Sequence, residues 1–235
     1  SPCGPGSRPG RRSSRHLADP VGEAQGGEGG VDVDRKVAGA VEQLWAGEFG
    51  NAYLHRNLDA AQGRAPFWDG IAARFPFDSV LEVGCTQGDN LVHLARHVPP
   101  DRIWGVDINP VVLDALRGHV PGTHPVLGVA RGLPFPDDSF DLVVTVGLLI
   151  HIPDDTLEQV MGELVRVSRR WVLSGEYHAD EQTEVVYRGH ERVLFKRDYS
   201  ALYQQFRPEL RLAEEKFLTK DEGFDRVTYQ VFEKP

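Results

Sequence analysis

The sequence predicts a doubly wound α/β sheet, with helices on both faces, in one main domain. Short apolar stretches and helical patterns alternate five times, and a last helix and two strands follow. The first changeover from strand to helix is a tight turn with two glycines, Gly84 and Gly88. With 235 residues, 40% of them hydrophobic, the chain can bury one sizeable core.

The glycine turn after residues 79–83 predicts a ligand site. Residues 79–83 are an apolar run suited to a buried strand, and Gly84 and Gly88 allow a tight turn that approaches a ligand closely. A helix is expected from about Asp89, and its first N–H groups would face the turn. The apolar residues of that helix recur at helical spacing, at Leu91, Leu94, Ala95 and Val98.

The residues of this turn indicate a cationic ligand. The spacing G-x-x-x-G differs from the dinucleotide fingerprint and from the P-loop. Glu82 ends the strand two residues before Gly84, where a carboxylate would repel a phosphate and attract a positive charge.

The pattern Glu82-x-Gly84-x-x-x-Gly88 resembles the first motif of class I S-adenosylmethionine-dependent methyltransferases, and Cys85 also fits. The ligand of that family carries an ammonium and a sulfonium. The resemblance implies a seven-stranded, mostly parallel, Rossmann-like sheet and a site for S-adenosyl-L-methionine at Glu82, Gly84, Thr86 and Gly88. Thr86 stands where the family usually has a glycine.

Three regions are expected along the chain. Residues 1–32 are rich in Gly, Pro, Ser and Arg, which predicts a disordered tail. Residues 33–76 are expected to form a helical cap, beginning with an amphipathic helix that contains Val41 and Trp45. The resemblance makes 77–235 the cofactor-binding methyltransferase domain, with a substrate-side insertion near 176–198.

The cap contains the pattern W-x-G-x-F-G-x-x-Y-x-x-R-N at 45–57. It is similar to the N-terminal cap of methyltransferases associated with pseudaminic acid biosynthesis. That resemblance implies that Tyr53 and Arg56 lie near the carboxylate of the cofactor or near the substrate. For Trp45 and Phe49, packing against the core is the favoured interpretation.

Asp107 ends the second expected strand, 102–106, about 20 residues after the glycine turn. A carboxylate at this place in an α/β fold accepts hydrogen bonds from both hydroxyls of a ribose. The alternative is that Asp107 caps the next helix, which Pro110 starts. If Asp107 binds the ribose, the adjacent Ile108 would lie against the adenine.

Two further strands are expected at 126–129 and 142–146. The pattern D-x-S-F-D-x-V before and within the second of them resembles the fourth strand of the same family. In that family, an acid that meets the adenine amino group usually stands where this chain has Val129. Either backbone groups near Ala130 and Arg131 take over that contact, or the affinity for the cofactor is lower. Gly147 leaves the carboxyl end of the fourth strand, where such sheets bind ligands.

His151 lies on the loop before a helix that starts near Pro153. With an ordinary pKa of about 6.5, it could take a proton from an alcohol as the methyl group arrives. The alternative is that it only hydrogen-bonds its own loop.

The stretch after the fifth expected strand, 171–174, carries Tyr177 and a group of cations. Its motifs Y-R-G-H and L-F-K-R-D-Y again resemble the pseudaminic-acid-associated group, which places the stretch over the substrate. The positive charges would suit a carboxylate-bearing acceptor such as an acidic sugar, and a solvated charged loop is the alternative. The cationic residues are Arg188, His190, Lys196 and Arg197.

Composition argues against several classes of protein. A net charge of −9 without a basic stripe argues against nucleic acid as the partner. No apolar run is long enough for a membrane span, and no signal peptide is visible, so a cytoplasmic protein is expected. The two cysteines form no disulfide framework, and the scattered histidines indicate no metal site.

These observations predict a methyltransferase that uses S-adenosyl-L-methionine on a small bacterial metabolite. O-methylation of a sugar-like or natural-product acceptor is the favoured reaction. N-, C- or RNA methylation and a non-catalytic binding protein of the same fold are the alternatives. The sequence leaves the oligomeric state open.

Overall fold

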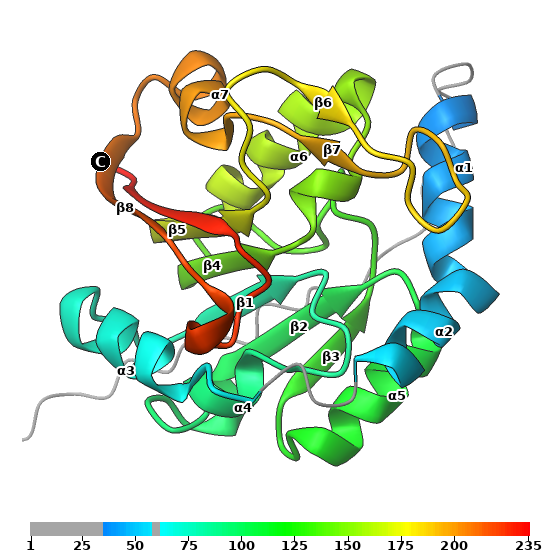
Figure 1. Cartoon of the computed structure of the whole chain (residues 1–235). Coiled ribbons are helices and arrows are strands. Elements are labelled where there is room, and N and C mark those ends of the chain that lie inside the picture. The colour runs from blue at the N-terminus through cyan, green and yellow to red at the C-terminus, as the bar shows by residue number, and fades with distance from the viewer. Residues whose placement is uncertain (1–34, 58–61) are drawn as a thin grey trace, which may run out of the picture.

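A computed structural model describes residues 35–57 and 62–235, so the predicted tail, 1–32, lies outside the described residues (Figure 1). Its centre is a seven-stranded sheet with the order β3-β2-β1-β4-β5-β9-β8, in which β9 runs in the direction opposite to the other six strands. The predicted doubly wound, mostly parallel sheet is therefore confirmed. The strands are β1 (Val80–Val83), β2 (Ile103–Asp107), β3 (His124–Leu127), β4 (Phe140–Val146), β5 (Ser168–Glu176), β8 (Arg211–Phe217) and β9 (Thr228–Glu233).

Helices cover both faces of this sheet. Successive strand residues point to opposite faces, so neighbours such as Val80 and Leu81 belong to different core clusters. One cluster includes α6 and α7, and the other includes α3, α4 and α5. The helices are α1 (Arg35–Ala46), α2 (Glu48–Arg56), α3 (Ala65–Arg74), α4 (Leu91–Leu94), α5 (Pro110–His119), α6 (Asp154–Val167) and α7 (Tyr199–Phe206).

Between β5 and α7, the chain forms a small separate sheet. It consists of β6 (Thr183–Glu184) and β7 (Phe195–Lys196), which pair antiparallel. This is the region in which the sequence predicts an insertion. Figure 1 shows it next to α1, so the insertion and the N-terminal cap lie on the same side of the molecule.

Two elements differ from the sequence prediction. β3 lies at His124–Leu127, two residues earlier than expected, because it pairs in parallel with β2 up to Asp107, and Gly128 already donates to the Asp107 carbonyl. The helix after Gly88 is regular only over Leu91–Leu94, and its continuation forms tighter turns with bonds between residues three apart. Leu91, Leu94 and Val98 of its predicted apolar face are nevertheless buried, and Ala95 is half-buried.

Asn109, at the end of the second strand–helix turn, holds the N-terminal cap on the sheet. Its Nδ2 donates to the Trp45 carbonyl at 3.1 Å and to Oδ1 of Asn51 at 2.9 Å. This approach needs a glycine at position 50, because a Cβ there would lie 1.9 Å from the Trp45 carbonyl oxygen. Gly50 therefore allows α1, α2 and α5 to meet.

Among the residues of the two described ranges, no helix has the length and apolarity to cross a membrane.

We expect Gly50→Ala to lower the free energy of unfolding by about 1–3 kcal/mol, because backbone atoms must move to admit the methyl group. Gly39→Ala is the matched control, since nothing lies within 4 Å of a Cβ at that position of α1. The control should be neutral or slightly stabilising, because alanine favours a helix. Urea denaturation of both variants tests this, and equal stability of the two would contradict the close contact at Gly50.

Candidate functional site

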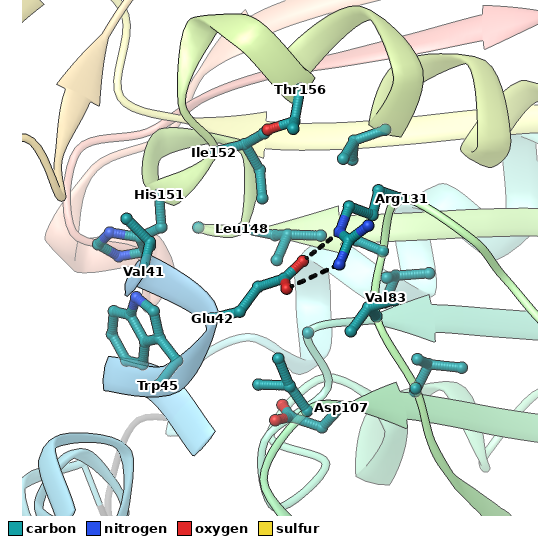
Figure 2. A pocket seen from close by; sticks show the side chains of 18 of the residues that line it. Val41, Glu42, Trp45, Val83, Asp107, Arg131, Leu148, His151, Ile152 and Thr156 are labelled. Atoms are coloured by element: carbon teal, nitrogen blue, oxygen red, sulfur yellow. Dashed lines mark hydrogen bonds and ion pairs between the residues drawn. The ribbon is translucent and has the colours of Figure 1, made fainter. Parts of the chain in front are cut away.

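The carboxyl ends of β1, β2 and β4 open into one cleft, which α1 covers from the other side (Figure 2). The cleft contains about 920 Å³ of space between its atoms, part of which is open to solvent. Most of its lining is apolar, and a few polar side chains enter it from different elements. These polar groups define its chemistry.

The glycines of the first turn have different tasks. Gly84 has a φ of 75° and lines the cleft, where a Cβ would contact Leu148 at 3.0 Å. Gly88 has a φ of 88°, and a Cβ there would lie 2.5 Å from the Leu116 side chain on α5. Gly88 thus allows helix packing and does not line the cleft, although the resemblance placed it with the cofactor residues.

Thr86 lines the cleft in a conformation that is unusual for a β-branched residue, with a φ of 48°. Its N–H donates to Oδ2 of Asp107 at 3.0 Å. This bond offsets part of the strain and holds the turn after β1 on the turn after β2. The position that departs from the family motif is therefore accommodated without a glycine.

Asp107 presents its carboxylate to the cleft from the end of β2. Its second oxygen, Oδ1, accepts from the N–H of Asn109 at 2.9 Å. Burial raises the pKa of Asp107, and the backbone hydrogen bonds oppose that rise. Asn109 caps α5 by accepting from the N–H of Val111, so the alternative that Asp107 is the cap is excluded. Each Asp107 oxygen keeps acceptor capacity for a ligand hydroxyl.

Glu82 is buried and is not among the residues that line the cleft, although the resemblance placed it with the cofactor residues, and one of its carboxyl oxygens is unpaired. Its Oε1 accepts from Nδ2 of Asn90 at 2.6 Å, whereas Oε2 has no hydrogen-bond partner in the described part of the chain. Burial raises the pKa of Glu82 to about 8, opposed by the Asn90 bond, and Arg64 nearby lowers it. An unpaired buried oxygen of this kind fits a cationic donor.

Arg64, which no sequence pattern indicated, is linked to Glu82 through Asn90. Its Nη1 donates to Oδ1 of Asn90 at 2.8 Å, and its guanidinium lies over the Phe224 ring. Its Nε donates to the Gly223 carbonyl. The two hydrogen-bond partners, Asn90 and Gly223, lie 26 and 159 residues away along the chain. No local pattern could have indicated such contacts.

A bidentate ion pair between Arg131 and Glu42 bridges the two sides of the cleft. Nε of Arg131 lies 2.7 Å from Oε1 of Glu42, and Nη2 lies 3.2 Å from Oε2 (Figure 2). The pair connects α1 to the loop after β3, where Ala130 also lines the cleft. Glu42, which the sequence did not indicate, brings a carboxylate to a region in which Val129 supplies none.

The other predicted cofactor residues divide into two groups. Ile108, Gly147 and Tyr53 line the cleft, and burial raises the pKa of the Tyr53 hydroxyl to about 12. Arg56 is exposed and outside the lining, with its guanidinium 5.6 Å from the centre of the Phe49 ring. In this structure, Arg56 therefore contacts aromatic rings of the cap instead of the cleft.

His151 lines the cleft in a defined tautomer. Its Nδ1 lies 2.5 Å from the Val193 carbonyl, which can only accept, so Nδ1 carries the proton and Nε2 is the free acceptor. Burial lowers the pKa of His151 to about 4. The expectation of an ordinary pKa is thus wrong, because the desolvated ring stays neutral at physiological pH.

The five predicted substrate residues do not line the cleft. Arg197 is only 2% exposed, pairs with Asp154 at 2.7 Å and donates to the carbonyls of Leu149 and Ile152, so it holds the loop before α6. The Tyr177 hydroxyl donates to Asp225. The other three lie on the surface or against rings, Lys196 over Tyr177, Arg188 over Tyr187 and His190 against Phe49.

Glu176, at the end of β5, positions the loop that carries His151. Its carboxylate is fully buried and accepts from the N–H groups of Leu148 and Ile150 and from the hydroxyl of Thr145. Burial raises its pKa to about 7. The sequence does contain a signal for this role, because an acidic residue directly after an apolar strand indicates a carboxylate at the carboxyl edge of the sheet.

Comparison with known proteins agrees with this geometry. A family of methyltransferase domains matches residues 80–170. The sheet that contains these residues has the class I methyltransferase fold. A phthiotriol/phenolphthiotriol dimycocerosates methyltransferase of Mycobacterium leprae is 35% identical over 92 residues, 38% of this chain and 33% of that protein. An uncharacterized methyltransferase of Schizosaccharomyces pombe is 34% identical over 103 residues, 39% of this chain and 36% of that protein. The chain spans about a third of the length of these curated relatives.

Solved structures share the fold of this chain. A Burkholderia thailandensis 1,6-didemethyltoxoflavin-N1-methyltransferase with bound S-adenosylhomocysteine has a TM-score of 0.66 at 14% identity, covering 87% of this chain and 93% of that chain. Magnesium protoporphyrin IX methyltransferase from Synechocystis, with bound S-adenosylmethionine, has a TM-score of 0.62 at 12% identity, covering 88% and 100%. The [4+2]-cyclase SpnF has a TM-score of 0.53 at 16% identity, covering 73% and 80%.

S-adenosyl-L-methionine is the cofactor that the cleft of this domain fits. The two oxygens of Asp107 can accept from the two ribose hydroxyls, and Ile108 supplies an apolar contact next to them. A phosphate-bearing ligand would instead meet the carboxylate of Asp107.

We expect Glu82→Gln to stabilise the protein more at pH 8 than at pH 5 in the absence of ligand. Folded Glu82 keeps its proton up to about pH 8, whereas the unfolded side chain releases it near 4.5. The folded state therefore binds more protons between these values, and stability from this group falls as the pH rises through them. The variant lacks this loss, so its gain over the parent at pH 8 should be on the order of 2 kcal/mol.

Urea denaturation at the two pH values measures this difference. Glu158→Gln, at an exposed position of α6, is the matched control and should show no pH-dependent gain. A Glu82→Gln effect that is equal at both pH values would show that the carboxylate is not protonated in the folded protein.

Proposed function

We propose that this chain is an S-adenosyl-L-methionine-dependent methyltransferase that methylates an oxygen of a small molecule. The observation that carries the proposal is the carboxylate of Asp107, fixed by Thr86 and Asn109 at the rim of an apolar cleft. Its oxygens accept from the ribose, and Glu82 accepts from the ammonium group. Backbone atoms of Ala130 would meet the adenine, since the loop after β3 lines the cleft.

When bound, the cofactor supplies a methyl group on a positively charged sulfur and becomes S-adenosylhomocysteine. The protein then has to align the acceptor oxygen with that methyl group and exclude water. The apolar lining from Leu148, Ile152 and Val160 serves this exclusion. Glu176 keeps the loop of residues 147–151 in place beside it.

His151 receives the proton of the acceptor at Nε2. The acceptor oxygen forms a bond to the methyl carbon, the carbon–sulfur bond breaks with its electron pair going to sulfur, and the O–H proton moves to the imidazole. The bond from Nδ1 to the Val193 carbonyl keeps Nε2 free for this task and supports the imidazolium.

The acceptor proposed from the sequence is a sugar-like or natural-product metabolite. The resemblance of residues 45–57 and 187–199 to the pseudaminic-acid-associated group supports this proposal. The expectation of an acidic acceptor is based on four cationic residues. One of them, Arg197, is already paired with Asp154 and with backbone carbonyls. A cytoplasmic location and the absence of a nucleic-acid or membrane partner also stay predictions.

A non-catalytic or otherwise active protein of the same fold is the second candidate. SpnF shows that this fold also carries an activity other than methyl transfer. Binding without turnover would favour this candidate, so the cofactor and the reaction need separate tests.

We expect Asp107→Ala to weaken S-adenosyl-L-methionine binding at least about tenfold, because two hydrogen bonds to a charged group are lost. Isothermal titration calorimetry measures the affinity. Asp114→Ala removes the same charge from an exposed position of α5 and should bind normally. If the parent protein fails to bind, the cofactor assignment fails with it.

We expect His151→Gln to lower kcat about a hundredfold without changing cofactor affinity. Because the pKa of His151 is about 4, the ring is neutral throughout pH 6–8, and the activity of the parent should show no titration of this group there. His55→Gln, on the exposed side of α2, is the control. Unchanged turnover in His151→Gln would exclude the role of a base.

A further inference from the structure

One N–H group beside the cleft has no partner in the described residues. Nε1 of Trp45 is buried and makes no hydrogen bond, although the indole lines the cleft. Buried donors are nearly always paired, so an unpaired one at a ligand site indicates a contact made by the ligand. The indole N–H can only donate, so that contact must be an acceptor atom.

The free acceptor of His151 lies next to this donor. The Trp45 and His151 rings are 4.5 Å apart between centroids, at an angle of 52°. Figure 2 shows the two side chains together at one end of the cleft, with the indole nitrogen turned toward the imidazole. The bond to the Val193 carbonyl fixes Nε2 of His151 as the acceptor. The site therefore offers one donor and one acceptor side by side.

We propose that Trp45 and His151 together bind the hydroxyl group of an aromatic acceptor, with Trp45 Nε1 donating to its oxygen and His151 Nε2 accepting its proton. This inference rests on the proposed methyl transfer and specifies its substrate class. Trp45, which the sequence favoured as a packing residue, becomes an acceptor-binding residue.

The arrangement selects oxygen over nitrogen. A hydroxyl oxygen has two lone pairs, so one can accept from Trp45 while the other attacks the methyl carbon. A neutral amine has a single lone pair, and accepting from Trp45 would occupy the pair that must attack. The indole N–H also stabilises negative charge that develops on the oxygen as its proton leaves.

The surroundings select an aromatic acceptor. Tyr53 lines the cleft together with Trp45 and His151, and it contacts the Trp45 ring edge-on at a centroid distance of 5.5 Å. Phe49 and Tyr187 do not line the cleft, but they support these rings at 5.1 Å from Trp45 and 5.7 Å from His151. Flat rings pack well against such a cluster, whereas a sugar carries several hydroxyls that each need a partner. A phenolic hydroxyl, with a pKa near 10, also gives up its proton to a weak base more readily than an alkyl alcohol does.

The N–H of Trp45 is covered in this structure, so the acceptor oxygen enters after a small rotation of one of the two rings. The backbone of Trp45 is held meanwhile by Asn109, and α1 is held by the pair of Glu42 with Arg131. These contacts keep the indole at the cleft while its ring adjusts.

Three probes of similar size distinguish a phenol, an aromatic amine and an alkyl alcohol as acceptors. They are 4-tert-butylphenol, 4-tert-butylaniline and trans-4-tert-butylcyclohexanol. The full chain is first tested for S-adenosylhomocysteine binding by calorimetry. Each probe is then added to the complex, and the indole N–H resonances of the four tryptophans are recorded by two-dimensional NMR. The Trp45 signal is identified by its absence in Trp45→Phe, and Trp68, Trp104 and Trp171 are internal controls.

We expect the phenol to shift the Trp45 signal downfield and to leave the other three unchanged. With S-adenosyl-L-methionine, the phenol should be methylated faster than the other two probes. Trp45→Phe should lower kcat for the phenol at least about tenfold with little change in cofactor affinity. These results would support the inference.

An unmoved Trp45 signal at saturating phenol, or equal turnover of the aniline, would overturn it. Turnover of N-acetylneuraminic acid without turnover of the phenol would also overturn it and leave the proposed methyl transfer intact. If the chain binds no S-adenosylhomocysteine, the proposed function itself fails, which distinguishes the two failures.

Discussion

The carboxylate of Asp107 is the point on which the arrangement of the site depends. It joins the turn after β1 to the turn after β2, because it accepts from Thr86 on one side and from Asn109 on the other. Asn109 in turn caps α5 and binds the Trp45 carbonyl, so one network of hydrogen bonds connects two strands of the sheet to the N-terminal cap. The helix that covers the cleft is thereby placed relative to the strands that form its floor.

Two buried glutamates at strand ends show how the same residue type can serve different purposes. Glu176 has its carboxylate satisfied by backbone N–H groups and a hydroxyl, so it fixes a loop. Glu82 retains an unpaired oxygen and a pKa raised to about 8. Its burial therefore carries an unfavourable desolvation free energy, which a cationic ligand can offset. In the same way, the unpaired indole N–H of Trp45 is a cost of folding that an acceptor molecule can remove.

The hydrogen-bond partners decide how the predicted residues can act. Asp107, Ile108, Gly147 and His151 reach the cleft from strand ends and the loops that follow them. Arg56 and Arg197 do not, because their guanidinium groups contact aromatic rings of the cap and the loop before α6, respectively. A motif can place a charge near a site along the chain, but the nearest carbonyl or carboxylate in space determines what it binds. The acidic acceptor expected from the charges is therefore less supported than an acceptor that suits the rings.

The sequence by itself determined the alternation of strands and helices, the glycine turn and the acid at the end of the second strand. Apolar periodicity and turn residues are local signals, and parallel strands bring their carboxyl ends to one edge. Only the tertiary structure decided that Glu42 enters the cleft, that Arg64 approaches Glu82, that His151 stays neutral and that the Trp45 N–H lacks a partner. These properties depend on desolvation and on contacts between segments 26 to 159 residues apart, about which local patterns carry no information.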